Sequence, residues 1–268
     1  MAGRSALINV MHKASQLASR RMMRDFGEVE NLQVSRKGAA DFVSQADITA
    51  ERTLREELEK ARPDYGFIME EGGKVAGAHP DSPVWIIDPI DGTTNFLHGI
   101  PHFAISLAVM EKSRLLAGTI FDPARNEFFY AEAGKGAFLN DRRMRVSGRR
   151  TLPESLFATG IPFLGHGTDE TDIQFLAELK TVMQASSGVR RMGTASLDLA
   201  WVAAGRYEGF WERGLNIWDI AAGVILVREA GGFVSDFAAR DKSLESGDVV
   251  AANAPIHVPL LKLLRSAK

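Results

Sequence analysis

Residues 85–96 read Trp85-Ile86-Ile87-Asp88-Pro89-Ile90-Asp91-Gly92-Thr93-Thr94-Asn95-Phe96. The apolar run over 84–87 predicts a buried strand, which delivers Asp88 and Asp91 into a turn that contains Pro89 and Gly92. Carboxylate oxygens suit Mg²⁺, and the backbone N–H groups at a helix start can bind an anion. The stretch therefore predicts a metal and phosphate site, with an ordinary Asp-Gly turn after a strand as the alternative.

Other acidic residues decide between these two interpretations. Glu70 and Glu71 follow the apolar segment 67–69, and Asp219 follows Trp218 at the start of an apolar periodic segment. Asp47 ends the segment 41–47. Taken singly, Asp47 and Asp219 are better explained as first-turn or N-cap residues, because carboxylates accept hydrogen bonds from the first N–H groups of a helix.

As a set, these residues resemble the inositol monophosphatase family of Mg²⁺-dependent sugar phosphatases. The pattern of that family is a Glu-Glu pair, then Asp-Pro-Ile-Asp-Gly-Thr, then a distant Trp-Asp-x-Ala-Ala-Gly. All three occur here in that order, at 70–71, 88–93 and 218–223, and the resemblance extends over nearly the whole chain. It implies an α/β fold, a layered α-β-α-β-α sandwich of two lobes with the active site where they meet.

The sequence itself alternates helix-like and strand-like segments, which favours helices layered on sheets. We expect an N-terminal lobe over 1–147 with most metal ligands, and a C-terminal lobe over 148–268 with Asp219 and the substrate pocket. The expected helices are 48–61, 172–184, 195–204 and 217–230. Besides 84–87, the expected strands are 103–110, 115–120, 155–159, 207–211, 233–235 and 249–252.

The first 24 residues carry basic side chains and no acidic ones, a composition that is also typical of a transit peptide. Against that, apolar residues from Leu7 to Met22 recur at helical spacing. The resemblance places a first helix here as well, so we predict a structural helix.

Composition excludes several other classes of protein. The net charge is −2 with both signs interspersed, so nothing global points to nucleic acid or an anionic membrane. The chain has no cysteine, which excludes disulfides and thiolate zinc sites and fits the reducing cytoplasm. No apolar run is long enough to span a bilayer.

Residue by residue, the resemblance implies a site with two or three Mg²⁺ ions. Glu70, Asp88 and the carbonyl oxygen of Ile90 would bind a first ion, and Asp88, Asp91 and Asp219 a second, while Glu70 would also support a weaker third. Four clustered carboxylates would raise one another's pKa unless cations lay between them. Such ions lower the pKa of water and stabilise a leaving alkoxide.

The resemblance also assigns catalytic and substrate-binding roles. Glu70 and Thr93 would hold the attacking water, and Asp47 would accept the hydrogen bond of Thr93. The substrate-binding residues would be Gly92, Thr93, Gly193, Thr194, Ala195, Glu212 and Lys37. Glu212 would accept a hydrogen bond from an inositol hydroxyl, although a solvated glutamate at a strand end is an equally good explanation.

The resulting expectation is a lithium-sensitive, cytoplasmic phosphomonoesterase that hydrolyses inositol 1-phosphate. A broader sugar-phosphate, fructose-bisphosphate or histidinol-phosphate phosphatase is the alternative enzyme. A regulatory or transcription-associated protein that retains the fold is the alternative from another class. The resemblance to this family also leads us to expect a homodimer.

Two further features are interpreted conservatively. Five arginines lie within 142–150, but with little aromatic interleaving they favour a solvated face over a nucleic-acid surface. His98 and His102 are four residues apart, as a metal pair on a helix would be. Gly99 and Pro101 argue against a regular helix there, so we expect turn and packing residues.

Overall fold

The computed structural model describes residues 3–26, 34–38, 41–162 and 168–267, and the side chains of residues 34–44 lie outside that description. Within it there is an eight-stranded sheet of order β10-β9-β8-β7-β6-β5-β3-β4. A five-stranded sheet has the order β12-β11-β13-β15-β14, and β1 pairs with β2 alone.

The helices and strands have the following bounds. The helices are α1 (Ala6–Phe26), α2 (Gln45–Ala61), α3 (Thr93–Leu97), α4 (Asp169–Ala185), α5 (Ala195–Ala203), α6 (Ile217–Glu229), α7 (Ser243–Ser246) and α8 (Ala254–Ser266), with a short 3-10 turn at Leu152–Glu154. The strands up to the middle of the chain are β1 (Val34–Gly38), β2 (Asp41–Ser44), β3 (Gly66–Met69), β4 (Gly73–Val75), β5 (Val84–Asp91), β6 (Ala104–Glu111), β7 (Arg114–Asp122), β8 (Glu127–Glu132), β9 (Gly136–Leu139) and β10 (Arg142–Met144). The remaining strands are β11 (Leu156–Thr159), β12 (Gly188–Arg190), β13 (Gly209–Glu212), β14 (Phe233–Ser235) and β15 (Val249–Ala252).

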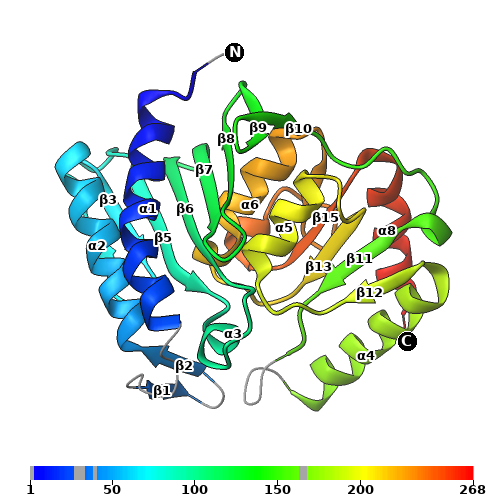
Figure 1. Ribbon diagram of the computed structural model, residues 1–268. Helices are drawn as coiled ribbons and strands as arrows, with labels where there is room; N and C mark the ends of the chain where they lie inside the picture. Colours follow the sequence, from blue (N-terminus) through cyan, green and yellow to red (C-terminus); the bar gives the residue numbers. More distant parts are fainter. Residues whose placement is uncertain (1–2, 27–33, 39–40, 163–167, 268) are drawn as a thin grey trace.

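The elements stack in five layers, which Figure 1 shows from left to right. Helices α1 and α2 cover one face of the large sheet, and α5 and α6 lie between the two sheets. Helices α4 and α8 cover the outer face of the small sheet. Three clusters of buried apolar side chains fill the spaces between the layers, and one of them surrounds α5 and α6 and reaches both sheets. The predicted α-β-α-β-α sandwich is confirmed.

Strand β5 lies inside the large sheet, and its sequence explains why. Trp85 and Ile87 are fully buried in the cluster beneath α1 and α2, whereas Ile86 joins the cluster around α6. Successive side chains of a strand point to opposite faces, so a strand covered on both faces is apolar throughout. This places the acidic end of β5 within the protein, beside the first turn of α6.

The prediction of a structural helix at the N-terminus is confirmed. Helix α1 spans 21 residues, and Ile8, Met11, Ala14, Ala18 and Met22 are buried against the large sheet and α2. These positions recur every three or four residues, as the packed face of a helix requires. No helix of the described ranges is both long and apolar enough to cross a membrane.

Three element boundaries differ by three or more residues from the sequence-based expectation, and the others agree more closely. Helix α2 begins at Gln45 rather than 48, so Asp47 is a first-turn residue, one of the two roles considered for it. Helix α4 begins at Asp169 rather than 172, because Thr168 caps it through the backbone N–H of Thr171. Strand β5 runs on to Asp91 instead of ending at Ile87, and this difference shapes the site.

The two expected lobes correspond to the two sheets. The large sheet uses residues up to Met144, and the small sheet begins at Leu156. Helices α5 and α6 nevertheless pack against strands of both sheets and share one apolar cluster with them. The boundary at residue 147 therefore stays a prediction.

Candidate active site

A bulge in β5 brings the two aspartates of the central motif to one side of the sheet. Asp88 pairs with Ser106 of β6 and Asp91 pairs with Ala104, so two residues of β5 oppose one of β6. In a regular strand, residues three apart point to opposite faces. The extra residue cancels that alternation and aims both carboxylates the same way. The expected turn after residue 87 is therefore a bulge that keeps the strand paired.

Gly92 ends the strand and starts the short helix α3. Its φ of 93° lies in the left-handed region, where glycine has no Cβ penalty. An added Cβ would lie 2.5 Å from Thr194 Oγ1, so the position also lacks space for a side chain. The sharp turn places Thr93 next to the acidic end of β5.

The hydroxyl of Thr93 contacts two oxygens. Thr93 Oγ1 lies 3.0 Å from Asp47 Oδ1 and 2.9 Å from the carbonyl oxygen of Ile90. A hydroxyl has one proton and two lone pairs, so when it donates to Asp47 it can still accept a hydrogen bond from another group. Asp47 is buried in the first turn of α2, which fixes the acceptor.

Glu70 reaches the site because β3 and β5 are parallel neighbours. Its backbone N–H donates to the carbonyl of Ile87 at 3.2 Å, so the chain leaves β3 beside the end of β5. The N–H of Glu71 donates to Glu51 Oε2 at 2.9 Å, which ties the next residue back to α2. The carboxyl ends of parallel strands meet at one edge of a sheet, where ligand sites form.

Asp219 arrives from the other half of the chain. It lies in the first turn of α6, where its Oδ2 accepts the backbone N–H of Asn216 at 2.7 Å. The Ser106 hydroxyl of β6 donates to the carbonyl of Trp218 at 3.1 Å, which holds this turn against the large sheet. Asp219 therefore caps its helix and also faces the carboxylates of β5.

The electrostatics show that these carboxylates form one cluster. Burial, followed by the charges of Glu70, Asp91 and Asp219, raises the pKa of Asp88 well above its usual range. Burial and the charges of Asp91, Glu70 and Glu212 raise the pKa of Asp219 as well. Burial raises the pKa of Asp91 to about 6, although hydrogen bonds from Ser196 and Ala195 oppose the shift. Each carboxylate destabilises the charged form of the others.

The donor set has the chemistry that a hard divalent cation requires. All donors are oxygens, and Asp88 Oδ1 is buried with no hydrogen-bond partner among the described residues. Within the described ranges, no three acidic or histidine side chains converge tightly enough to hold an ion without movement. The chemical type of these ligand atoms thus fits Mg²⁺, and the assignment of ligands to ions is part of the proposed function.

The opposite wall of the site is the start of α5. Thr194 is the N-cap of α5, and Ala195 and Ser196 form its first turn. The backbone N–H of Ser196 donates to Asp91 Oδ2 at 2.6 Å, which joins α5 to the end of β5. Gly193, Thr194 and Ala195, the residues expected to form the pocket wall, are thus brought next to the acidic cluster.

Comparison with known proteins agrees with this architecture. The model of the inositol monophosphatase family matches residues 4–268. An inositol-1-monophosphatase from Mesorhizobium japonicum is 55% identical over 262 residues, which cover 98% of this chain and 97% of that protein.

The chain belongs to the inositol monophosphatase family.

This membership confirms the expected family and its class of enzyme, the phosphoric monoester hydrolases. The crystal structure of the extragenic suppressor protein SuhB from Bartonella henselae superposes with a TM-score of 0.93 at 51% identity. That superposition covers 98% of this chain and 99% of the other. A protein named Nus factor SuhB from Pseudomonas aeruginosa is 44% identical over 260 residues, covering 97% of this chain and 96% of that protein. The family therefore includes close relatives with a regulatory name.

The residue expected to select substrate within this family, Glu212, is half-buried at the end of β13. An added Cβ on Gly160 would lie 1.8 Å from Glu212 Oε1, so the carboxylate packs directly on that glycine. Burial and the charge of Asp91 raise the pKa of Glu212 to about 8, with Arg191 opposing them. Glu212 is therefore not fully solvated, and its role in binding substrate stays a prediction.

Two other expectations concern Lys37 and the histidines. The backbone of Lys37 lies in β1, but its side chain is outside the described part of the structure. His98 caps the end of α3, and His102 is buried with its ring 5.5 Å from Trp201. Burial, followed by the charge of Arg125, lowers the pKa of His102 to about 4. The two histidines are turn and packing residues, as expected.

The sequence reasoning missed two residues that hold the site together. Ser196 contacts Asp91 from 105 positions away, and Asn95 Nδ2 donates to the carbonyls of His102 and Met192 at 2.8 Å each. Asn95 stands inside the quoted motif, and that place is the sequence signal that could have found it. Ser196 carries no comparable signal, because it acts through its backbone.

Proposed function

We propose that this protein is a Mg²⁺-dependent phosphomonoesterase that hydrolyses inositol 1-phosphate to myo-inositol and phosphate. The observation that carries the proposal is the acidic cluster itself. Glu70, Asp88, Asp91 and Asp219 come from three segments of the chain. Burial raises the pKa of all three aspartates, and repulsion from neighbouring carboxylates adds to the shift of Asp88 and Asp219. A fold that gathers like charges in a buried place needs cations to balance them.

The ligand set follows from the positions of these oxygens. Glu70, Asp88, Asp91, Asp219 and the carbonyl of Ile90 would bind two or three Mg²⁺ ions. When bound, Mg²⁺ supplies a lower pKa for water and charge stabilisation for the phosphoryl group and the leaving oxygen. Inhibition by Li⁺ belongs to the same proposal, since Li⁺ resembles Mg²⁺ in size but has half the charge.

The protein's own groups would orient the attacking water. Thr93 donates its proton to Asp47 across 3.0 Å, which leaves an Oγ1 lone pair to accept a hydrogen bond from water. Glu70, which leaves β3 beside the end of β5, would hold the other proton of that water. Alignment of this kind contributes to rate because it removes the entropy of bringing the reactants together.

The remaining residues would hold the substrate. The backbone N–H groups of Gly92 and Thr93 would bind phosphate oxygens. Glu212 would accept a hydrogen bond from a ring hydroxyl, and the wall at Gly193, Thr194 and Ala195 would confine the ring. A broader sugar-phosphate specificity is the alternative within the same chemistry.

The experiment is phosphate release from a panel of inositol 1-phosphate, glycerol 2-phosphate, fructose 1,6-bisphosphate and histidinol phosphate, with Mg²⁺ and with EDTA. We expect the highest kcat/KM for inositol 1-phosphate and no turnover in EDTA. A higher kcat/KM for another ester would favour the broader phosphatase. Turnover that persists in EDTA would contradict the metal-dependent mechanism.

One observation favours a second candidate, a regulatory role alongside or in place of catalysis. The relative from Pseudomonas aeruginosa bears the name Nus factor SuhB. The arginine segment 142–150, however, is partly committed to structure, because Arg149 pairs with buried Glu208 at 3.0 Å. A folded protein without phosphatase activity on every ester in the panel would favour this candidate. As further parts of the proposal, we place the enzyme in the cytoplasm as a homodimer.

A further inference from the structure

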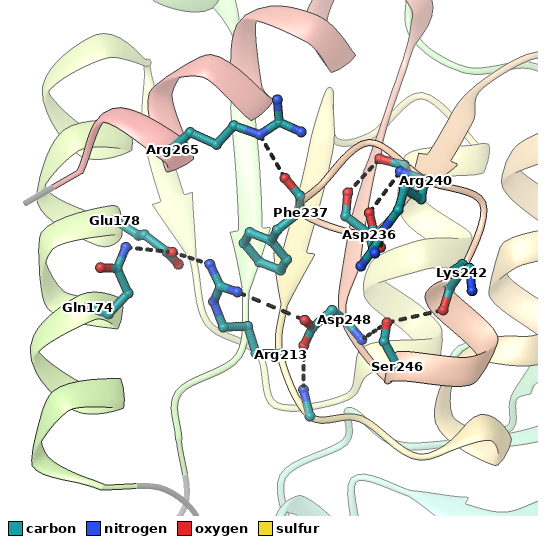
Figure 2. Close-up of polar contacts among 12 residues, drawn as sticks. Gln174, Glu178, Arg213, Asp236, Phe237, Arg240, Lys242, Ser246, Asp248 and Arg265 are labelled. Carbon is teal, nitrogen blue, oxygen red and sulfur yellow. Dashed lines mark hydrogen bonds and ion pairs between the residues drawn. The ribbon is translucent and has the colours of Figure 1, made fainter.

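Arg213 lies on the far side of β13 from the site carboxylate Glu212. Glu212 is the last residue of β13, and Arg213 is the first residue of the bend that follows. Glu212 packs on Gly160, whereas Arg213 points toward α4 and the ring of Phe237 (Figure 2). The active site and the outer helix α4 thus meet at two neighbouring residues.

The guanidinium of Arg213 has three kinds of contact. Its Nη2 lies 2.5 Å from Glu178 Oε1, and its Nη1 lies 4.0 Å from Asp248 Oδ2. Its Cζ is 3.4 Å from the centroid of the Phe237 ring. Figure 2 shows Arg213 between Glu178 and Asp248, with Gln174 donating to the same Glu178 oxygen at 3.0 Å.

Glu178 makes the ion pair more than a surface contact. Its side chain is 1% exposed on α4, while that of Arg213 is 40% exposed. A buried carboxylate without a cation is costly, so Glu178 constrains where Arg213 can lie. Stacking of the guanidinium on an aromatic ring adds a second restraint.

The backbone after Arg213 is restrained as well. The N–H of Gly214 donates to Asp248 Oδ1 at 3.3 Å, and the N–H of Leu215 donates to the carbonyl of Gly247 at 2.9 Å. Residues 213–218 connect Glu212 to Asp219, so this short segment joins a substrate residue to a metal ligand. Among the residues of the site, Glu212 is the one directly bonded to Arg213.

Glu212 has little freedom at the end of β13, where its side chain is half-buried. Packing on Gly160 leaves little room for an altered backbone, because the carboxylate occupies the space of the missing Cβ.

We propose that Arg213 is a positioning residue for specificity: its ion pair with Glu178 holds the end of β13 so that Glu212 meets the ring hydroxyl of the substrate. This inference rests on the proposed function, since it concerns recognition of the inositol ring. It adds α4 to the elements that determine which phosphate ester is hydrolysed.

The test is Arg213→Met, which removes the guanidinium and keeps much of the apolar length. The quantity measured is the ratio of kcat/KM for inositol 1-phosphate to kcat/KM for glycerol 2-phosphate. We expect this ratio to fall about tenfold, the effect of one misplaced charge-assisted hydrogen bond, through a higher KM for inositol 1-phosphate. Arg213→Lys should recover part of the ratio, because an ammonium can still pair with Glu178.

Arg240→Met is the matched control. Arg240 pairs with Asp236 at 2.7 Å, and the side chain of Asp236 is 2% exposed. The change therefore also leaves a buried carboxylate without its cation, in the same half of the protein. Asp236 and Arg240 lie in the loop after β14, so the change leaves β13 and residues 213–218 unaltered. We expect a similar fall in Tm and an unchanged ratio.

The double variant Glu212→Gln with Arg213→Met separates positioning from general loosening. If Arg213 acts through Glu212, the double variant has the ratio of Glu212→Gln alone, whereas independent effects multiply. Should Arg213→Met fail to fold, Arg213→Lys and Glu178→Gln are measured instead, and both should lower the ratio.

Two results would overturn the role of Arg213. An unchanged ratio in folded Arg213 variants, with a Tm loss like that of Arg240→Met, would show that the ion pair is only structural. Multiplicative effects in the double variant would show that Arg213 does not act through Glu212. A wild-type protein that does not hydrolyse inositol 1-phosphate would instead overturn the proposed function, and this role with it.

Discussion

The backbone N–H of Ser196 donates to Asp91 Oδ2 across 2.6 Å, and this contact joins the start of α5 to the acidic end of β5. Asp91 therefore has two functions in one side chain. One oxygen stabilises the first turn of α5, and the charge contributes to the buried acidic cluster. Substitutions at Asp91 can separate the two, because an amide oxygen still accepts a hydrogen bond but has no charge.

Asp91→Asn should abolish most turnover without unfolding the protein. We expect kcat to fall by at least about 10²-fold, the scale seen when one group that stabilises transition-state charge is removed. The hydrogen bond from Ser196 can persist, so α5 should stay in place. Phosphate release in saturating Mg²⁺ and circular dichroism provide the check. Wild-type turnover in the variant would remove Asp91 from the ligand set.

The pH dependence of stability tests the burial of the acidic cluster. The pKa of Asp91 is about 6 in the folded protein and about 4 in the unfolded chain. The folded state therefore binds this proton more tightly, so its contribution to stability is present below about pH 4 and is lost as the pH rises to about 6. The pKa values of Asp88 and Asp219 shift in the same direction.

We expect the Tm of the metal-free protein to fall relative to that of Asp91→Asn as the pH rises from about 4 to 6. Mg²⁺ should raise the wild-type Tm most at higher pH, where the carboxylates are ionised. Thermal melts of both proteins in EDTA and in Mg²⁺ give these differences, and general effects of pH cancel between them. A Tm difference that does not vary with pH would contradict the raised pKa of buried Asp91.

Much of the fold follows from local sequence patterns, whereas the contacts that join distant elements at the site do not. The apolar alternation at Trp85, Ile86 and Ile87 predicts a strand covered on both faces, and the structure confirms it. The bulge after Asp88 is not visible in the sequence, because one extra residue in β5 is defined only by its pairing with β6. The contact of Ser196 with Asp91 depends on how two distant elements pack.

The same limit applies to charged residues. Glu212 occupies a strand end, where most glutamates are solvated, and only the packing on Gly160 shows that it is half-buried. Glu178 lies on a helix with acidic residues in its first turn, and its burial is equally invisible from sequence. Burial of a charge is decided by tertiary contacts, which single-sequence periodicity cannot supply.

Asn95→Leu should weaken both the fold and the site. The change removes two hydrogen bonds and leaves the carbonyls of His102 and Met192 without this donor, at a cost of about 1–3 kcal/mol in unfolding free energy. Asn253→Leu is a matched control, because Asn253 Nδ2 likewise bridges two carbonyls, those of Ser147 and Arg149. Chemical denaturation measures both losses of stability.

The two asparagine variants should differ in activity. Asn95 connects α3 to residues 192–194, so its loss should lower kcat/KM of the folded protein, whereas the Asn253 variant should retain it. Equal activity in the two folded variants would mean that Asn95 stabilises the protein without positioning the site.

The final prediction concerns the protonation of Glu212. Burial, with the charge of Asp91, raises its pKa to about 8, so at about pH 7 the group is mostly protonated in the metal-free protein. Only the ionised carboxylate accepts a charge-assisted hydrogen bond from a ring hydroxyl, which is about twice as strong as a neutral one. Bound Mg²⁺ would offset the charge of Asp91 and lower the pKa of Glu212, while burial would still keep it above its usual range. The preference for inositol 1-phosphate over glycerol 2-phosphate should therefore rise with pH over the range from about 5 to 8 in which Glu212 ionises. Glu212→Gln should have a lower preference at high pH and no rise, because its amide does not titrate. The ratio of kcat/KM values across this range is the measurement, and it cancels effects of pH on the shared phosphate chemistry. A parallel rise in the variant would assign the titration to another group and leave Glu212 without a role in specificity.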